Sequence, residues 1–331
     1  MKRLITLFTG QWADLELETM CEKARKMGYE GLELACWGKH LDASRAATDD
    51  NYVKEVLDTM KKYDLKLEAL GTHIIGQCVG DAPDPRLDGF APSIYAGDSE
   101  AIRNWAIEEM KNCAIAAKKL GASVCTSFTG SPIWKYIYSF PQATPEMIDK
   151  GFEEIVKLWT PILDVFKENG IKYALEVHPT EIAFDYWSTK KLLTEYFHDR
   201  EEFGLNFDPS HLLWQGVTPH VFLEDFICRV YHVHVKDVAV NLNGRNGILG
   251  SHIDFGDSRR GWDFRSPGRG DVDFESIARV LNTYGYSGPL SVEWEDSGMD
   301  REYGAAEAVA FIKSKMDFTP SEFKFDEALA N

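Results

Sequence analysis

Acidic and imidazole side chains gather at the ends of four apolar segments in the second half of the chain, within LEVHP, NFDPSH, HVHVKD and SVEWED. Acids are rare in apolar segments unless they are paired or bind a metal. Carboxylates that face one cavity repel each other unless a cation neutralises them, and oxygens with one imidazole suit Mn²⁺, Mg²⁺ or Co²⁺. We therefore predict one divalent cation held by acids and imidazoles of this set: Glu176, His178, Asp208, His211, His232, His234, Asp237, Glu293, Glu295 and Asp296.

The spacing of these residues does not decide which residue of each segment binds the metal. Every second side chain of an extended segment lies on the same face, so Glu176 and His178 share a face, as do His232 and His234. A single acid at a strand end could equally form a cap or a surface salt bridge. Several acids together favour the metal site.

The pattern along the chain indicates eight strand–helix units. Their number favours a closed barrel over an open doubly wound sheet, and no GxGxxG follows the first strand. We predict an α/β fold, a single (β/α)8 TIM barrel over residues 1–316 with long loops at its C-terminal face, and a tail or arm over residues 317–331. Glycines 28, 121, 170 and 285 predict helix ends. The predicted strands are 4–8, 31–36, 65–70, 123–128, 172–177, 203–207, 230–235 and 290–294, and the predicted helices 15–27, 51–63, 100–120, 145–169, 188–197, 219–227, 274–284 and 301–314.

Three loops, 72–99, 129–143 and 238–273, are longer than a barrel needs. Each follows a predicted strand, so they gather at the face where barrel enzymes build their sites. Arg265 lies in the third loop together with Arg259 and Arg260, and Lys236 lies at its base. We expect these cations to receive an anionic or polyhydroxyl substrate.

Further residues could line the barrel mouth. His73 follows the third predicted strand, where it either binds substrate hydroxyls or packs in the loop. Glu33 either lines the pocket with Trp37 or forms an ion pair within the barrel. Five tryptophans at or near loop starts could stack on a sugar or aromatic ring, although core packing is the alternative: Trp12, Trp37, Trp134, Trp214 and Trp262.

Composition excludes several classes of function. The formal net charge of -17 disfavours nucleic acid, which needs clustered cations, and a membrane surface. No apolar stretch approaches the length of a spanning helix, and the first residues do not resemble a signal peptide, so we expect a cytoplasmic protein. Six cysteines without framework spacing are expected to be reduced core thiols.

The strings LEVHP, FDPSH, HVHVKD and SVEWED, in this order and with a GRGDVDF turn, resemble the sugar phosphate isomerase/epimerase family, the xylose isomerase-like barrels. The resemblance runs along nearly the whole chain. It implies that Glu176, Asp208, His234 and Glu293 are the metal ligands, and that Glu176 and Glu293 also act as an acid–base pair beside the substrate carbonyl. It further implies that His211 binds the substrate.

The histidine at position 178 is a difference from the ketose 3-epimerases of this family. A neutral imidazole beside a metal-bound substrate suits a general base near neutral pH, so we predict that His178 is catalytic. The alternative is that it hydrogen-bonds the backbone of the turn before Pro179.

Within the family, LFTGQWADLELE, GLELACWGKHLD and RRGWDFRSPGRGDVDF resemble the catalytic (alpha) subunits of C-glycoside deglycosidases. This resemblance implies a metal-dependent lyase that abstracts a proton from a keto-sugar, forms an enediolate and cleaves a 3-oxo-C-glycoside by elimination. It also implies a small β-rich partner subunit. We expect Mn²⁺ as the cation, a sugar or glycoside as the substrate, and an oligomer.

Three other functions fit parts of the pattern. A ketose or inosose isomerase, epimerase or dehydratase needs the same enediolate. An endonuclease of abasic DNA shares this kind of barrel, but needs further metal ligands and a basic face. A non-catalytic sugar-binding barrel predicts that Glu176→Gln changes neither ligand affinity nor activity.

Overall fold

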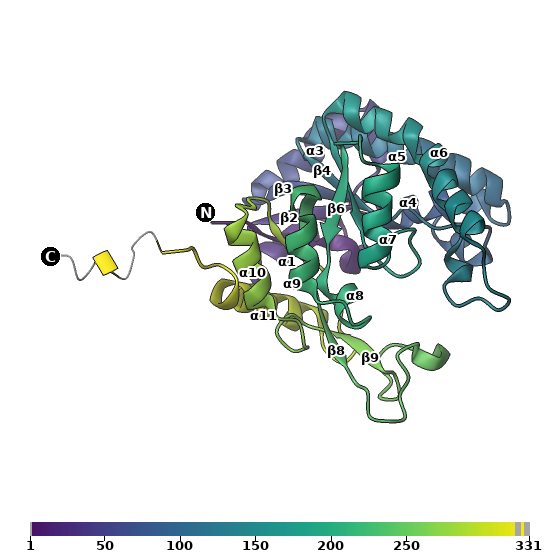
Figure 1. Ribbon diagram of the computed structural model, residues 1–331. Helices are drawn as coiled ribbons and strands as arrows, with labels where there is room; N and C mark the ends of the chain where they lie inside the picture. The colour runs from purple at the N-terminus through teal and green to yellow at the C-terminus, as the bar shows by residue number, and fades with distance from the viewer. Residues whose placement is uncertain (1, 322–325, 328–331) are drawn as a thin grey trace.

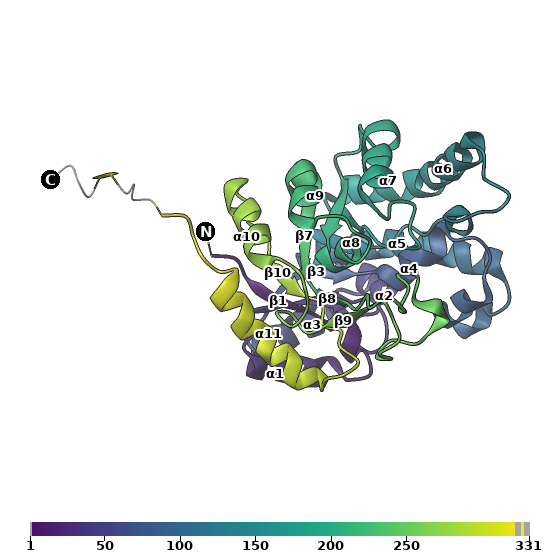
Figure 2. The ribbon, with the colours of Figure 1, turned by 60° about the horizontal axis from the view of Figure 1, so that its bottom comes forward.

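The chain folds into a closed barrel of eight parallel strands, surrounded by helices (Figures 1 and 2). The computed structural model describes residues 2–321 and 326–327. The strands follow one another around the barrel in the order β1-β10-β7-β6-β5-β4-β3-β2, which confirms the predicted (β/α)8 fold. They are β1 (Ile5–Phe8), β2 (Gly31–Ala35), β3 (Lys66–Gly71), β4 (Val124–Ser127), β5 (Lys172–Glu176), β6 (Phe203–Phe207), β7 (Val230–Val235) and β10 (Leu290–Val292).

The helices begin and end on local signals. Asp98 and Thr144 accept backbone N–H groups in the first turns of α5 and α6, and the predicted glycine ends of α1, α5 and α6 adopt positive φ. The predicted helix 188–197 is α7 followed by a π-helical turn, Leu192–Tyr196. The helices are α1 (Leu17–Met27), α2 (Ala43–Thr48), α3 (Asp50–Lys62), α4 (His73–Gly80), α5 (Ser99–Leu120), α6 (Pro145–Asn169), α7 (Tyr186–Lys191), α8 (Pro209–Leu213), α9 (Pro219–Phe226), α10 (Phe274–Thr283) and α11 (Arg301–Lys315).

The predicted loop 72–99 contains a helix, α4, so His73 begins a helix rather than lying in a loop. Its sequence HIIGQCVG favours helix weakly, because it has two glycines and three β-branched residues. The glycines allow close packing: a Cβ on Gly76 would lie 2.1 Å from the Phe128 carbonyl oxygen, and one on Gly80 would lie 2.3 Å from that of Thr129. Tertiary packing therefore overrides local preference here.

The predicted loop 238–273 also contains regular structure. Strands β8 (Asp237–Val240) and β9 (Trp262–Arg265) form an antiparallel ribbon that projects from the barrel (Figure 1). Ala239 pairs with Asp263, and Asp237 pairs with Arg265. The long separation between the two strands hid this pairing from the sequence pattern.

Three remaining expectations can be compared with the structure. Five cysteines are buried free thiols, whereas Cys228 is exposed, which corrects its predicted core position. Of the predicted tail 317–331, residues 322–325 and 328–331 lie outside the described residues. None of the described helices is long and apolar enough to cross a membrane.

Candidate metal centre and active site

Four predicted metal ligands meet at the carboxyl ends of neighbouring strands. Glu176 ends β5, Asp208 precedes α8, His234 lies near the end of β7, and Glu293 follows β10. One ligand atom from each lies within 4.8 Å of those of the other three, and all four side chains are buried. We call Glu176, Asp208 and Glu293 the upper set, with His234 facing it.

His234 Nδ1 points into the upper set. It lies 2.9 Å from Glu176 Oε2 and 3.0 Å from Glu293 Oε2. Asn206, which the sequence analysis missed, donates from Nδ2 to Glu176 Oε2 over 2.8 Å. Its position two residues before Asp208 on one strand was the available signal, because the two side chains share a face.

The donor atoms fit a divalent cation. Asp208 Oδ1 accepts hydrogen bonds from the Ser210 amide and hydroxyl, both at 2.7 Å. Asp208 Oδ2 is buried and has no hydrogen-bond partner among the described residues. A buried carboxylate oxygen without a donor is costly, and three carboxylates with one imidazole are typical ligands of Mn²⁺ and similar cations.

Burial and neighbouring groups shift the pKa values of the upper set in opposite directions. Burial would raise the pKa of Glu176, but hydrogen bonds with His211 and His234 outweigh burial and hold this pKa well below its usual range. For Glu293, burial is outweighed by the charge of Lys236, which lowers the pKa to about 2. Burial raises the pKa of Asp208 to about 6.

A cavity of about 520 Å³ opens above these ligands. Glu176 and Glu293 form part of its floor. All but one of the predicted substrate-binding residues line it, namely His211, His73, Lys236 and Trp37. Its volume falls within the range of about 300–1,000 Å³ that is common for small-molecule sites.

The histidines of this cavity surround Glu176. His73 Nε2 lies 3.3 Å from Glu176 Oε2, and His211 Nε2 lies 3.2 Å from Glu176 Oε1. The ring of His178 packs against that of His211, with 4.2 Å between centroids. Burial holds the pKa of His178 well below its usual value, with a further contribution from His211. His178 is therefore a neutral imidazole at neutral pH.

The alternative role of His178 was a hydrogen bond to the backbone of the turn before Pro179. Its Nδ1 makes no such hydrogen bond. This nitrogen is buried and has no hydrogen-bond partner in the part of the chain that the structure describes. His178 also lines a second cavity of about 310 Å³ beside the larger cavity. The two cavities share the lining residues Ile74, Phe128, His178 and Thr180, so they are neighbours on either side of these side chains.

Aromatic residues of the third long loop form a wall of the cavity. Trp262 on β9 stacks on Trp214, with centroids 4.4 Å apart and planes 5° apart. Lys236 Nζ lies 4.2 Å from the ring centroid of Phe264 and 3.3 Å from Glu293 Oε2. Burial opposes the charge of Lys236, but Glu293 and Glu295 outweigh burial and raise its pKa, so it remains a cation.

Arg265 does not line this cavity, which corrects its predicted contact with the substrate. Side chains of β9 alternate, so Trp262 and Phe264 face the cavity while Asp263 and Arg265 line a separate one. Arg265 Nη1 lies 3.4 Å from Asp263 Oδ2. The two other predicted arginines also have local partners: Arg260 packs over Phe255 and Trp262, and Arg259 pairs with Asp257.

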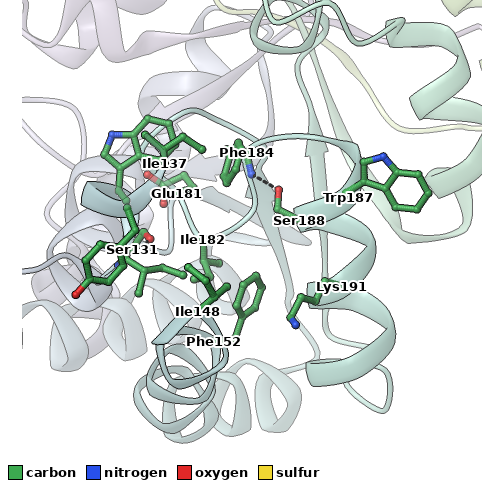
Figure 3. A pocket seen from close by; sticks show the side chains of 13 residues that line it. Ser131, Ile137, Ile148, Phe152, Glu181, Ile182, Phe184, Trp187, Ser188 and Lys191 are labelled. Carbon is green, nitrogen blue, oxygen red and sulfur yellow. Dashed lines mark hydrogen bonds between the residues drawn. The ribbon is translucent and has the colours of Figure 1, made fainter. Parts of the chain in front are cut away.

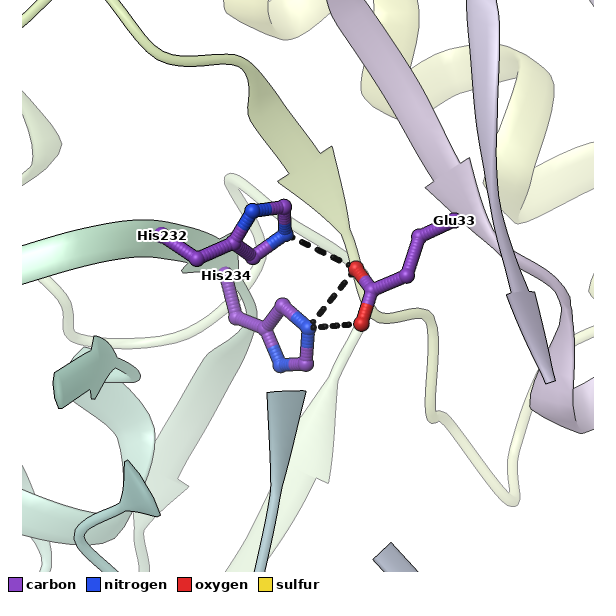
Figure 4. Close-up of side chains that lie close together, drawn as sticks. All are labelled: Glu33, His232 and His234. Atoms are coloured by element: carbon purple, nitrogen blue, oxygen red, sulfur yellow. Dashed lines mark hydrogen bonds and ion pairs between the residues drawn. The ribbon is translucent and has the colours of Figure 1, made fainter. Parts of the chain in front are cut away.

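Glu33 forms a second cluster with His232 and His234 (Figure 4), and it contacts the ring nitrogen of His234 that faces away from the upper set. It is fully buried and does not line the cavity with Trp37, which settles its two predicted alternatives in favour of an ion pair within the barrel. Its partners are His232, His234, Ser291 and Thr126. We call Glu33, His232, Ser291 and Thr126 the lower set.

Another cavity, of about 340 Å³, lies beside α6 and α7 (Figure 3). Its lining is mostly apolar and includes Trp134, one of the five loop tryptophans. Glu181 is the one carboxylate among its lining residues, and its Oε2 accepts the Thr129 and Gly130 amides at 2.7 and 2.6 Å. A single carboxylate held by backbone amides makes no metal site. Trp12, in contrast, is buried in the main core.

Known proteins resemble this chain in sequence. Protein YfiH of Bacillus subtilis (strain 168), whose function is uncharacterized, is 24% identical over 328 residues, covering 93% of this chain and 98% of YfiH. Inosose dehydratase of Clostridium beijerinckii is 32% identical over 215 residues, covering 64% of this chain and 68% of that enzyme. The match with inosose dehydratase of Clostridium perfringens (strain 13) spans 50% of that enzyme.

Solved structures share the fold. The apo form of 3-keto-D-glucoside 4-epimerase YcjR from E. coli gives a TM-score of 0.67 at 15% identity, covering 95% of this chain and 100% of that one. The IOLI protein with a bound zinc atom gives 0.63 at 20% identity, covering 95% and 96%. The family described as Xylose isomerase-like TIM barrel matches residues 21–315. The chain therefore belongs to the xylose isomerase-like TIM barrel family.

Proposed function

We propose that this chain is a divalent-metal-dependent lyase that cleaves 3-oxo-C-glycosides by elimination, as the catalytic subunit of a C-glycoside deglycosidase. Two neighbouring cavities, of about 520 and 310 Å³, carry this proposal. They share His178 among their lining residues, and Glu176, Glu293 and the aromatic wall line the larger one. We infer that they are two lobes of one cleft. A substrate made of a sugar and a bulky aglycone would occupy both lobes, whereas a free ketose would leave one empty.

Glu176, Asp208, His234 and Glu293 would hold the cation, for which we expect Mn²⁺, with Mg²⁺ or Co²⁺ as alternatives. The zinc atom in the IOLI protein supports a divalent cation in this fold. When bound, such a cation stabilises the negative charge that develops on a substrate carbonyl oxygen.

The remaining chemistry belongs to the side chains around the cleft. His178, neutral and without a partner at Nδ1, takes the proton from the sugar carbon next to the carbonyl. The electron pair left by that proton forms a carbon–carbon double bond, and the bond between the sugar and the aglycone breaks. The aglycone carbon then receives a proton, so the products are an unsaturated keto-sugar and the free aglycone. Glu176 and Glu293 are the further acid–base groups in reach.

Polar side chains would orient the keto-sugar. His211 and His73 flank Glu176 and can hydrogen-bond sugar hydroxyls, while Trp37 closes one side of the cavity. Lys236, kept charged by Glu293 and Glu295, presents a cation to substrate oxygens.

The second candidate is a ketose or inosose isomerase, epimerase or dehydratase. The 32% identity with inosose dehydratase of Clostridium beijerinckii favours it. It needs the same proton abstraction, after which water leaves or the proton returns to carbon.

Incubation with substrates distinguishes the two candidates. The protein with Mn²⁺ is mixed with a 3-oxo-C-glycoside, with and without a small β-rich candidate subunit, and aglycone release is followed by mass spectrometry. We expect release; inactivity with the subunit present would overturn the lyase proposal. Proton exchange or water loss from a ketose or inosose in D₂O would instead support the second candidate.

A partner subunit and an oligomer are parts of the proposal. Exposed apolar side chains near the 340 Å³ cavity support a protein contact on this side, with Tyr138 90% and Phe140 98% exposed. Light scattering of the chain alone and with the candidate subunit measures both properties. A monomer whose mass does not change on mixing would contradict them.

A further inference from the structure

The carboxylate of Glu33 has a hydrogen-bond partner on every side. His232 Nε2 lies 2.8 Å from Oε2, and the Ser291 hydroxyl donates to the same oxygen over 2.7 Å. Thr126 donates to Oε1. These three partners come from β7, β10 and β4, so the barrel itself holds the orientation of the carboxylate.

His234 connects this lower set to the upper set. Its Nε2 lies 3.1 and 3.2 Å from the two Glu33 oxygens (Figure 4). Its Nδ1 faces Glu176 and Glu293. The ring therefore presents one nitrogen to each carboxylate cluster. All three groups of possible metal ligands found among the described residues include this single imidazole.

Of the two sets, the upper set is the one that has a carboxylate oxygen without a hydrogen-bond partner and side chains that line the cavity. Asp208 Oδ2 lacks a hydrogen-bond partner among the described residues, and Glu176 and Glu293 line the cavity. Both Glu33 oxygens are occupied by donors, and Glu33 does not line the cavity. Glu33 is thus placed to act on a metal ligand without being one.

We propose that Glu33 is a positioning residue for the metal centre: it accepts the Nε2–H of His234, which leaves the Nδ1 lone pair directed at the cation. The inference rests on the metal centre in the proposed function. Histidine ligands commonly donate their second N–H to a carboxylate, which fixes the tautomer and the ring orientation. Loss of such a partner typically weakens metal binding about 10–100-fold.

The first test measures metal affinity without any turnover. Zn²⁺ is titrated against a competing chelator into metal-free wild type, Glu33→Gln and Glu181→Gln. Glutamine keeps the shape of the side chain but accepts the Nε2–H more weakly. We expect the Kd for Zn²⁺ to rise about 10–100-fold in Glu33→Gln. Glu181→Gln, which also replaces a buried carboxyl by an amide but contacts none of the four ligands, should keep the wild-type Kd.

An unchanged Kd in a folded Glu33→Gln would overturn the inference, because Glu33 would then only neutralise buried charge. Wild type that binds no Zn²⁺ would overturn the inference and the metal centre together. Failure of the proposed reaction with Zn²⁺ binding intact would affect only the proposed reaction.

A second test needs no variant, in case Glu33→Gln does not fold. Long-range ¹H–¹⁵N spectra of the Zn²⁺-loaded wild type distinguish the two ring nitrogens of each histidine. His234 should show a protonated Nε2 and a metal-bound Nδ1. Metal at Nε2, or an Nε2 without a proton, would contradict the role of Glu33. A merely structural role for Glu33 makes no demand on this tautomer.

Discussion

The two carboxylate clusters on either side of His234 differ in how fully their atoms are paired. Each oxygen of Glu33 in the lower set has donors in the barrel wall. In the upper set, Asp208 Oδ2 has no hydrogen-bond partner among the described residues, and two carboxylates open onto the cavity. Buried polar groups are normally satisfied, so the unsatisfied cluster marks the place where a ligand belongs.

The largest expected effect concerns the upper set. Glu176→Gln removes a proposed metal ligand and acid–base group, so kcat/KM should fall about 10³-fold or more. The measurement is aglycone release from a 3-oxo-C-glycoside, or water loss from an inosose. Asp58→Asn, in an exposed pair with Lys54, serves as the control and should retain activity. Full activity of Glu176→Gln would contradict the role of Glu176 as a metal ligand and acid–base group.

The lower set should instead contribute to stability. Glu33→Ala leaves His232 and His234 without their shared carboxylate, and breaking such a buried pair typically costs about 3–5 kcal/mol. Urea unfolding of the metal-free protein measures the loss. Asp58→Ala at the surface should cost less than about 1 kcal/mol. Equal losses in the free energy of unfolding of the two variants would show that the lower set does not contribute to stability.

Asp208→Asn should instead stabilise the metal-free protein. It removes one of the crowded carboxylates, while asparagine can still cap α8 through the Ser210 amide. We expect a gain of about 1 kcal/mol in the free energy of unfolding, as is common when a functional site is relieved of strain. Unfolding by urea in the presence of a chelator tests this, and a loss of stability would show that the upper set is satisfied without metal.

The last prediction concerns Glu181, which belongs to neither cluster. Burial, followed by the charge of Asp81, raises its pKa from 4.5 to about 8. The folded protein thus keeps this proton at pH values where the unfolded chain has already released it. The stabilisation that comes from this tighter proton binding is complete below about pH 4.5 and is lost as the pH rises to about 8. The Tm of wild type should fall more over this range than that of Glu181→Gln. Parallel Tm profiles would show that the two backbone amides keep the carboxyl ionised.

The sequence predicted the barrel because its strand runs are apolar and regularly spaced, and two strands, 203–207 and 230–235, have the predicted bounds. Barrel topology then brings the residues at the strand ends together, so Glu176, Asp208, His234 and Glu293 could be proposed as a group. Their roles as ligands and catalysts stay predictions.

Other features depend on contacts that no local pattern encodes. Every residue of GLELA is buried, so alternation could not show on which side Glu33 lies, and its partners His232 and His234 come about 200 residues later. Helix α4 forms through close packing rather than preference. The orientation of Arg265 follows from β9, which the sequence did not reveal as a strand.

In the proposed enzyme, the β8–β9 ribbon would influence substrate selectivity separately from catalysis. It supplies Trp262 and Phe264 to the cavity, and Asp237 anchors its return by accepting the amides of Gly268, Gly270 and Val272. The proposed proton-transfer and metal-binding groups all come from other segments. If the proposed function is right, exchanging this segment should change which aglycone fits while the reacting groups keep their positions.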